Sequence, residues 1–551
     1  MSGVGKGITT SSIAKILQSK GFKINPIKVD PYLNVDAGTM NPTEHGEVFV
    51  LKSGLETDQD MGNYERFLNT DLGDENYMTS GTIYKHVIEK ERSLGYKGKC
   101  VEAIPHIRDE IVRRFEKATE INKSDISIIE IGGTVGDYQN IMFIEAARVL
   151  KLKNPNDVLF VLVSYAPLPA KIGEMKTKPT QNAMRALNGL GVQADMVVVR
   201  SEGAMDGKRK EKIAISCNVM PENVISAPDV LSIYDVPINF EKDNLGERVL
   251  ALLNIKKKSK VDMKEWRAYL KKIKTARKKV KIGIVGKYFD TGDFVLSDAY
   301  ISVIEALKFS SYSQGAKPEL SWLNAKSFEK GANLSVLGKF DGILIPGGFG
   351  ETGVEGKIKA IEYARKNKIP YFGLCYGMQL MLVEYARNVL RLKNAHTIEI
   401  DENTPHPVID VMPEQKKILE TKDYGGTMRL GSYPCIVKKE TIARDAYLSA
   451  GALAKAGKKH LIHERHRHRY EVNPEYVEKF TQKGMLFSGV SPDDKLMEIA
   501  ELSRDIHPFF LGTQFHPEFQ ARPLAPHPLF NEFIKSALRG KGRQNRVDSR
   551  R

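Results

Sequence analysis

The chain has 551 residues, of which 41% are apolar and 27% are charged, and its formal net charge is +15. This length is too great for one hydrophobic core and predicts two domains of about 250 residues each in a soluble globular protein. The sequence contains no uninterrupted apolar run of ~18 residues and no charged-then-apolar leader, so we expect a cytoplasmic protein that binds no membrane.

The excess positive charge lies in two segments. Residues 256–279 carry +10 and residues 541–551 carry +4, so the rest of the chain is near neutral. Such blocks are typical of a solvated linker and a disordered tail, and we predict no nucleic-acid partner. The four cysteines are far apart and form no CxxC pair, which excludes a disulfide framework and a structural zinc site.

The N-terminal segment is rich in glycine. Gly5 and Lys6 stand shortly before a helix-like run that follows from Ile13. Glycines and a lysine at a helix start can hold phosphates through backbone N–H groups, the helix dipole and the ammonium. The segment is not a strict GxxxxGK[ST] motif, because Gly7 replaces the hydroxyl residue. A phosphate-binding loop and an ordinary N-terminal loop are both open readings.

Two acidic segments, 56–62 and 129–137, combine carboxylates with glycines at the predicted ends of strands. Their oxygen ligands, Asp60 and Glu130 among them, suit a magnesium ion that bridges nucleotide phosphates. Turn and cap carboxylates are the alternative reading.

The first half alternates apolar runs with amphipathic stretches, which predicts a parallel sheet with crossover helices. The predicted strands are near-continuously apolar, as expected for strands covered on both faces: 126–130, 158–163 and 196–199. Strand character is then lost over residues 240–276, where Trp266 and Tyr269 are the only obvious anchors. We predict a domain boundary in this segment.

Residues 176–181 read Lys-Thr-Lys-Pro-Thr-Gln and supply two ammonium groups, two hydroxyls and an amide. Proline stiffens a loop, so these donors could hold a second polyphosphate and a base edge. A solvated basic loop is the alternative. Lys212 reads by itself as a helix-surface residue.

The second half opens with a predicted strand at 280–285, followed by a helix around 299–307. A later apolar run, 342–345, leads into a Pro-Gly-Gly-Phe-Gly turn at 346–350, whose backbone amides could stabilise an oxyanion. The backbone amides of this turn would lie at the end of a strand, where open α/β sheets place their sites.

Cys375 ends an apolar run and is followed by a helix-like segment, with Gly373 and Gly377 around it. A sharp strand-to-helix turn exposes the sulfur and directs helix N–H groups at it, which favours the reactive thiolate. His516 and Glu518 lie two apart in a segment predicted to be extended, so they would face the same side, and the carboxylate would orient the imidazole. The pattern predicts a cysteine nucleophile with its base.

These segments resemble the class I glutamine amidotransferase domain. The resemblance implies that Cys375 attacks the side-chain amide of glutamine, that His516 is the general base and then the acid, and that Glu518 orients it. It assigns glutamine and oxyanion binding to Gly348, and glutamine binding to Tyr376, Gly377, Met378, Gln379, Glu399 and Arg469. The Arg-His-Arg-His-Arg run at 465–469 could also be a metal-binding or nucleic-acid patch. Its closeness to the glutaminase segments favours a carboxylate-binding arginine, and we expect no metal site because no acidic or cysteine ligands flank the histidines.

Further strings resemble the CTP synthase family over nearly the whole chain, from Ser2 to Leu538. They include residues 28–32, 45–49, 56–58, 64–67, 130–137 and 176–181 in the first half and residues 425–431 and 465–471 in the second. The resemblance implies two doubly wound α/β domains. They are a P-loop-like synthase domain similar to dethiobiotin synthetase at 1–255 and a glutamine amidotransferase domain at 280–540, with a basic linker at 256–279 and a disordered tail at 541–551.

The implied reaction is phosphorylation of UTP O4 by ATP and displacement of the phosphate by ammonia from glutamine, which gives CTP in pyrimidine nucleotide biosynthesis. Matching positions assign Mg²⁺ to Asp60 and Glu130, and ATP to Gly5, Lys6, Gly7, Asp60, Arg200, Pro228, Asp229 and Val230. They assign UTP or CTP to Ser2, Asp137, Tyr138, Gln139, Lys176, Thr177, Lys178, Pro179, Thr180, Gln181 and Lys212. Residues 423–431 resemble a lid associated with activation by GTP, and a homotetramer, with filaments as a further form, is implied.

Family members carry a strand and further glycines before the position of Ser2. We interpret this chain as a truncated gene model and expect a weakened ATP-dependent step with glutamine hydrolysis better preserved.

Two alternatives stay open. One is an ATP-dependent amidotransferase that acts on a carboxylate, like the cobyrinic acid amidating enzymes. The other is a non-enzymatic structural or regulatory subunit that keeps the fold, for instance in filaments.

Overall fold

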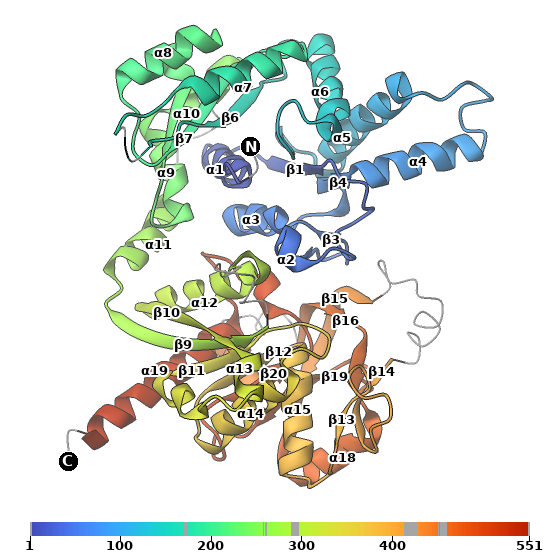
Figure 1. Cartoon of the computed structure of the whole chain (residues 1–551), viewed down its shortest axis with the longest axis vertical. Coiled ribbons are helices and arrows are strands. Elements are labelled where there is room, and N and C mark those ends of the chain that lie inside the picture. The colour runs from blue at the N-terminus through green and yellow to red at the C-terminus, as the bar shows by residue number, and fades with distance from the viewer. Residues whose placement is uncertain are drawn as a thin grey trace. The chain divides into compact units, whose positions relative to one another are not determined.

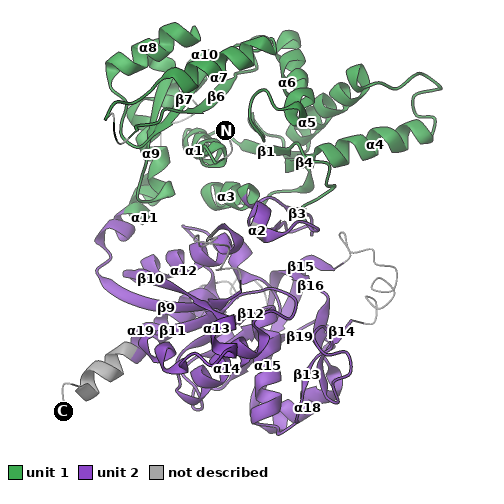
Figure 2. Ribbon diagram, in the orientation of Figure 1, with its two compact units in different colours: residues 1–37, 60–270 green, residues 38–59, 271–551 purple. Residues whose placement is uncertain are grey.

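The computed structural model of the chain describes residues 3–548 except 170, 172, 257, 259–261, 288–296, 413–427, 450 and 452–459. The predicted ligand Ser2 and the lid residues 423–427 therefore lie outside the described residues. The chain divides into two compact units, and each contains strands and helices, so the prediction of two α/β domains is confirmed (Figure 2). The first unit comprises residues 1–37 and 60–270, and the second comprises 38–59 and 271–551.

The first unit contains two three-stranded sheets, in which all neighbouring strands are parallel. Their orders are β4-β1-β5 and β6-β7-β8. The strands are β1 (Ile24–Asp30), β4 (Tyr77–Thr79), β5 (Ile126–Ile131), β6 (Val161–Tyr165), β7 (Met196–Ser201) and β8 (Val224–Pro228). Three of them match the apolar runs expected from the sequence.

Helices connect these strands, as Figure 1 shows. Helix α1 packs on β1 and β5, and α5 packs on α6. The helices are α1 (Lys6–Ser19), α3 (Gln59–Leu68), α4 (Ser80–Arg92), α5 (Arg108–Asn122), α6 (Ile141–Lys153), α7 (Lys178–Gly189), α8 (Gly207–Cys217), α9 (Val236–Lys242), α10 (Leu245–Leu252) and α11 (Lys264–Thr275). Parallel strands require such crossovers, because consecutive strand starts lie at the same sheet edge.

The second unit is built on a nine-stranded sheet with the order β10-β9-β11-β12-β20-β19-β18-β15-β16. The strands from β10 to β20 pair in parallel, whereas those from β20 to β16 pair antiparallel. These strands are β9 (Lys278–Gly286), β10 (Ala316–Asn324), β11 (Gly342–Ile345), β12 (Tyr371–Leu374), β15 (Arg429–Val437), β16 (Leu461–His468), β18 (Met485–Val490), β19 (Met497–Leu502) and β20 (Phe510–Thr513). A small sheet adds β13 (His396–Thr397), β14 (Pro407–Val411) and β17 (Tyr470–Val472).

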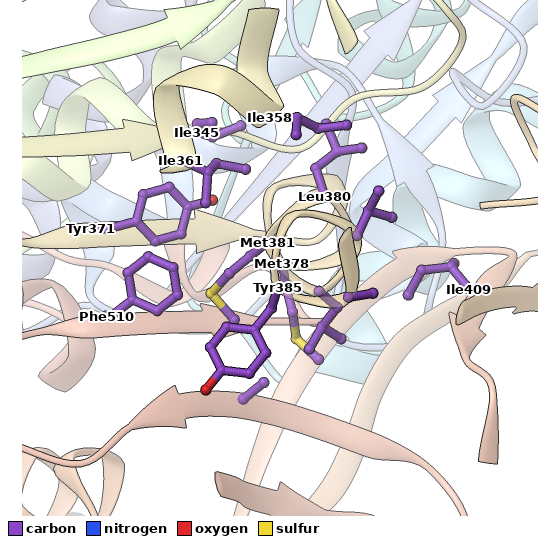
Figure 3. Close-up of a cluster of buried hydrophobic side chains, with 14 of the residues drawn as sticks. Ile345, Ile358, Ile361, Tyr371, Met378, Leu380, Met381, Tyr385, Ile409 and Phe510 are labelled. Atoms are coloured by element: carbon purple, nitrogen blue, oxygen red, sulfur yellow. The ribbon is translucent and has the colours of Figure 1, made fainter. Parts of the chain in front are cut away.

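The helices of the second unit include two pairs that pack on the large sheet, α12 with α19 and α14 with α15. Their bounds are α12 (Ile301–Ser313), α13 (Ala325–Glu329), α14 (Val354–Lys366), α15 (Tyr376–Asn388), α17 (Ile442–Ser449), α18 (Pro474–Gln482) and α19 (Pro528–Asp548). Figure 3 shows part of the core, where Met378 and Met381 of α15 lie among apolar side chains and Tyr371 lies beside Phe510. The last two rings have centroids 5.0 Å apart. This packing fixes the start of α15 against β12 and β20.

Residues 38–59 form part of the second unit, a placement that the sequence did not predict. They contain α2 (Pro42–His45), β2 (Phe49–Val50) and β3 (Glu56–Thr57). The side chain of Glu47 accepts from the N–H of Ser302 at 3.1 Å near the start of α12.

The two basic segments both contain helix. In α11 the side chains of Trp266 and Tyr269 are buried, as expected for anchors, and the Trp266 ring packs on Phe67 and Tyr234. Helix α19 continues to Asp548, into residues 541–551 for which the sequence predicted a disordered tail. Each residue added to an existing helix gains a backbone hydrogen bond. A prediction made from charge alone does not include this gain. No helix in the described ranges has an apolar stretch long enough to cross a bilayer.

Candidate active sites

Cys375 lies between β12 and α15 in a backbone conformation with φ 48° and ψ −102°, which non-glycine residues rarely adopt. Its N–H donates to the Thr513 carbonyl at 2.6 Å, which ties the turn to β20. Gly377 is required here, because a Cβ on it would lie 2.3 Å from the Ile345 carbonyl oxygen. The sulfur therefore lies at the start of α15, whose first N–H groups have no partner within the helix.

His516 and Glu518 contact each other as predicted, with 2.7 Å between Nδ1 and Oε1. The expected backbone was wrong, because Glu518 lies in a short 3₁₀ helix, η9 (Pro517–Gln520), and not in an extended segment. Burial by itself would lower the pKa of His516, but the Glu518 carboxylate and the Cys375 thiolate outweigh it and raise this pKa to about 10. The imidazole is therefore cationic near neutral pH.

The sulfur of Cys375 has two further polar neighbours. It lies 3.8 Å from the carbonyl oxygen of Arg467 and 3.6 Å from the side-chain nitrogen of Gln514. Gln514 also accepts from Gln379 at 3.3 Å. The sequence assigned no role to Gln514, although it stands two residues before His516.

The turn after β11 lies against the same groups. The N–H of Gly350 donates to the Glu399 carboxylate at 2.8 Å, and the Tyr376 hydroxyl donates to the Gly350 carbonyl at 3.2 Å. Burial raises the pKa of Glu399, opposed by this N–H and by two lysines, Lys287 and Lys357. The structure thus brings Gly348, Tyr376, Gln379 and Glu399 into one region, while Met378 is a core residue packed on Gly512.

Substitution of Gly347 tests the position of the imidazole. A Cβ on Gly347 would lie 2.7 Å from Cε1 of His516, so Gly347→Ala should displace the ring and lower glutamine hydrolysis. We expect a loss of about 10- to 100-fold, measured as glutamate release. Gly348→Ala is the steric control for stability, because its Cβ would meet only Tyr376 at 4.0 Å and should leave thermal unfolding unchanged. Full hydrolysis by the Gly347 variant would contradict this geometry.

Lys357 of α14 is a buried lysine that the sequence did not single out. Its side chain is 2% exposed, and Nζ lies 4.9 Å from the centroid of the Tyr376 ring. Burial lowers the pKa of Lys357 to about 7, with Lys287 adding to the decrease and Glu399 and Glu329 opposing it.

Lys357→Met should stabilise the protein most at and below neutral pH. The unfolded lysine keeps its proton up to its ordinary pKa of 10.5, whereas the folded one loses it near 7, so the native protein gains stability as pH rises between these values. The advantage of the Met variant should therefore shrink by up to about 1.4 kcal/mol per pH unit above neutrality. Denaturant unfolding over this range measures it, with the exposed Lys366→Met as control. A pH-independent difference would contradict the low pKa.

The arginines of the 465–469 run have different partners. Arg465 donates to the Val50 carbonyl at 3.1 Å, and Arg467 donates to the Glu56 carboxylate at 2.7 Å. Two of the three arginines therefore hold residues 38–59, and the third, Arg469, is the predicted glutamine ligand.

The histidines of this run lie beside a buried network of charged side chains, and burial lowers the pKa of both His466 and His468 well below its usual value. The structure places acidic side chains against them, contrary to the sequence-based reasoning. Glu498 lies 3.6 Å from His466, and Glu471, three residues further along the chain, lies 3.5 Å from His468. Arg429 contacts both Glu471 and Glu498, at 3.2 and 2.8 Å. No set of three His, Cys, Asp or Glu side chains in the described part of the chain is arranged to hold a metal ion.

The first unit contains a second cluster of charged groups, centred on Lys28. Its ammonium lies 2.6 Å from Asp60, 3.1 Å from Glu130 and 3.5 Å from Asp30. Burial would raise the pKa of Asp60, but Lys28 outweighs it and lowers this pKa, whereas burial prevails and raises the pKa of Glu130. Lys28 begins the 28–32 string that carries part of the family resemblance, but the sequence assigned it no role.

The glycine-rich loop lies beside this cluster. Helix α1 begins at Lys6 with Gly5 at φ 88°, and a Cβ on Gly7 would lie 1.9 Å from Asp60 Oδ1. Lys6 donates to the Gly133 carbonyl at 3.1 Å. A Cβ on Gly5 would lie 3.3 Å from Arg200, whose guanidinium pairs with Asp229 at 3.2 Å. The structure therefore gathers most of the predicted ATP ligands, with Pro228 and Val230 flanking Asp229 in sequence.

The predicted UTP ligands are less tightly gathered. Pro179 lies in the first turn of α7 and not in a loop, a position where its missing N–H removes no helical hydrogen bond. The side chain of Thr180 is buried against Ser164. Lys176 pairs with Glu174 at 2.6 Å, and Lys212 also interacts with that carboxylate, so the two lysines share one region.

Among the other predicted UTP ligands that the structure describes, Thr177 and Gln181 are buried and bond to each other, whereas the rest are exposed. Gln181 donates to Thr177 at 3.2 Å. Tyr138 is 93% exposed, and its neighbours Asp137 and Gln139 are exposed, as is Lys178.

Comparisons with known proteins agree across both units. A family model described as CTP synthase N-terminus matches residues 1–255, and one described as glutamine amidotransferase class-I matches residues 295–536. The chain is 48% identical to the CTP synthase of Caldanaerobacter subterraneus subsp. tengcongensis and 47% identical to that of Pyrococcus abyssi, in each case over 98% of this chain and 96% of the relative. Among solved structures, it is similar to the glutaminase domain of Trypanosoma brucei CTPS with bound acivicin, at 33% identity over 47% of this chain and 94% of that chain, with a TM-score of 0.41.

Proposed function

The chain belongs to the CTP synthase family, and we propose on this premise that it is a ligase that converts UTP to CTP with nitrogen from glutamine, in pyrimidine biosynthesis. The observation that carries the proposal is the pairing of two sites in one chain. The second unit holds Cys375 beside the His516–Glu518 pair, and the first unit holds Lys6, Asp60 and Glu130 around a helix start.

In the glutaminase half-reaction, the Cys375 thiolate attacks the amide carbon of glutamine. The negative charge that develops on the amide oxygen would be stabilised by N–H groups of the 346–350 turn and of the first turn of α15. His516 donates its proton to the departing nitrogen, which leaves as ammonia, and then accepts a proton from the water that hydrolyses the thioester. Glu399 and Arg469 have the charges needed for the α-amino and α-carboxylate groups of glutamine.

In the synthase half-reaction, ATP phosphorylates O4 of UTP, and ammonia displaces the phosphate. Lys6 and the N-terminus of α1 would bind ATP phosphates, with Arg200 and Asp229 nearby. Asp60 and Glu130 fit a magnesium ion, which typically takes one or two carboxylates plus phosphate oxygens and would neutralise phosphate charge when bound. Lys176 and Lys212 would bind the UTP phosphates.

Further family properties extend the proposal. GTP would activate the enzyme through the 423–431 lid, CTP would bind near Asp137 to Gln139, and the chain would form a homotetramer. They rest on the family resemblance, and the exposure of Tyr138 is consistent with a ligand or subunit contact there.

The absorbance change from uracil to cytosine tests the proposal directly. The protein is incubated with ATP, Mg²⁺, glutamine and UTP, and each component is omitted in turn. CTP formation that requires all four is expected. Glutamate release without any UTP-dependent change, despite saturating ammonia, would overturn it in favour of a carboxylate acceptor or a non-enzymatic role.

A further inference from the structure

Gln514 is held in one orientation beside the nucleophile. It follows β20 directly, and its side chain is fully buried. Its backbone N–H donates to the backbone carbonyl of Glu498 at 2.8 Å. Its side-chain amide lies between the Cys375 sulfur at 3.6 Å and Gln379 at 3.3 Å.

A chain of hydrogen bonds determines which end of this amide faces the sulfur. The carbonyl of Tyr470 can only accept, so the Gln379 group 3.0 Å from it must be the NH₂. That NH₂ then donates to the oxygen of Gln514, and the NH₂ of Gln514 is left to point at the sulfur. The backbone carbonyl of Tyr470 in β17 therefore fixes the orientation of both buried glutamines, so that Gln514 presents its NH₂ to the sulfur.

The two polar contacts of the sulfur favour opposite protonation states. The Arg467 carbonyl can accept from a thiol S–H, but it repels a thiolate. The Gln514 NH₂ is a donor and stabilises the thiolate, since hydrogen bonds to charged groups are stronger than those to neutral ones.

We propose that Gln514 is a further catalytic residue, which donates a hydrogen bond to the Cys375 thiolate before attack and after the thioester is hydrolysed. The S–H proton passes to His516, the sulfur lone pair forms the C–S bond, and the nitrogen leaves as ammonia with that proton. No bond of Gln514 forms or breaks. The inference rests on the proposed glutaminase half-reaction and extends it to a residue outside the Cys–His–Glu set.

The test is the pH dependence of Cys375 alkylation by iodoacetamide in the full chain, with exposed Cys100 replaced by Ser. Gln514→Leu removes the donor, and Gln514→Glu keeps the oxygen that Gln379 contacts but places a carboxylate near the sulfur. We expect the alkylation midpoint to rise by about one pH unit in the Leu variant and further in the Glu variant. Glutamine kcat should fall about 10- to 100-fold with KM changed less than about three-fold.

Gln520→Leu is the matched control, because that amide bonds to His463 and Glu464 and not to the sulfur. Unchanged midpoints in both Gln514 variants, or a rise in KM with unchanged kcat, would overturn the proposal. Alkylation needs neither glutamine nor UTP, so a shifted midpoint in a protein that makes no CTP would retain this inference and reject the proposed function.

Discussion

Cys375→Ala should abolish glutamine-dependent CTP formation, by at least about a thousand-fold, and leave ammonia-dependent CTP formation intact. The sulfur is the only atom at the start of α15 suited to attack an amide, and alanine keeps the turn without a nucleophile. The Lys28 cluster, with Asp60 and Glu130, belongs to the other unit, so the substitution leaves its charges unaltered. CTP formation is measured by absorbance with each nitrogen source.

The exposed Cys100→Ala is the control and should behave as the unsubstituted chain with both nitrogen sources. Loss of both activities in the Cys375 variant, while its thermal unfolding is unchanged, would mean that the two half-reactions do not use separate sites.

Asp60→Asn should have the reverse effect. We expect CTP formation to fall at least about a hundred-fold with either nitrogen source, while basal glutamate release without nucleotides persists. Asparagine keeps the shape but removes a charge that Lys28 contacts at 2.6 Å and that the proposed magnesium site requires. ATP dependence of the residual rate, measured over a range of Mg²⁺ concentrations, reports on the site itself.

Asp125→Asn is a matched control in the same unit, since Asp125 pairs only with the backbone of Lys23 and the side chain of Lys258 in the described structure. Retained CTP formation in Asp60→Asn would remove Asp60 from the phosphate site. If the variant unfolds at a lower temperature than Asp125→Asn, Asp60→Glu, which keeps the charge, separates misfolding from loss of the ligand.

The sequence predicted best what depends on local chemistry. The apolar run, the cysteine and the glycines around Cys375 predicted the strand, turn and helix, because steric and hydrogen-bonding limits act over a few residues there. A helix was also predicted after the glycine-rich start, but α1 begins at Lys6 and not near Ile13. The His516–Glu518 contact was predicted correctly from a wrong backbone, since residues two apart can also meet across a 3₁₀ turn.

Features that depend on distant contacts were missed. Lys357 reads as an ordinary helical lysine, and only the fold buries it against Tyr376. Gln514 stands two residues before His516, but its donor role follows from Gln379 and Tyr470, both far away in sequence.

The placement of residues 38–59 affects how this protein can be divided for separate expression. A fragment that starts at residue 271 would lack the partners that Arg465 and Arg467 contact, including Val50 and Glu56. Fusing 38–59 back onto such a fragment through a flexible linker would restore these partners. A separately expressed glutaminase should therefore contain both residues 38–59 and the segment from 271 onward. Deleting the first 255 residues as a whole would remove part of the second unit together with the first.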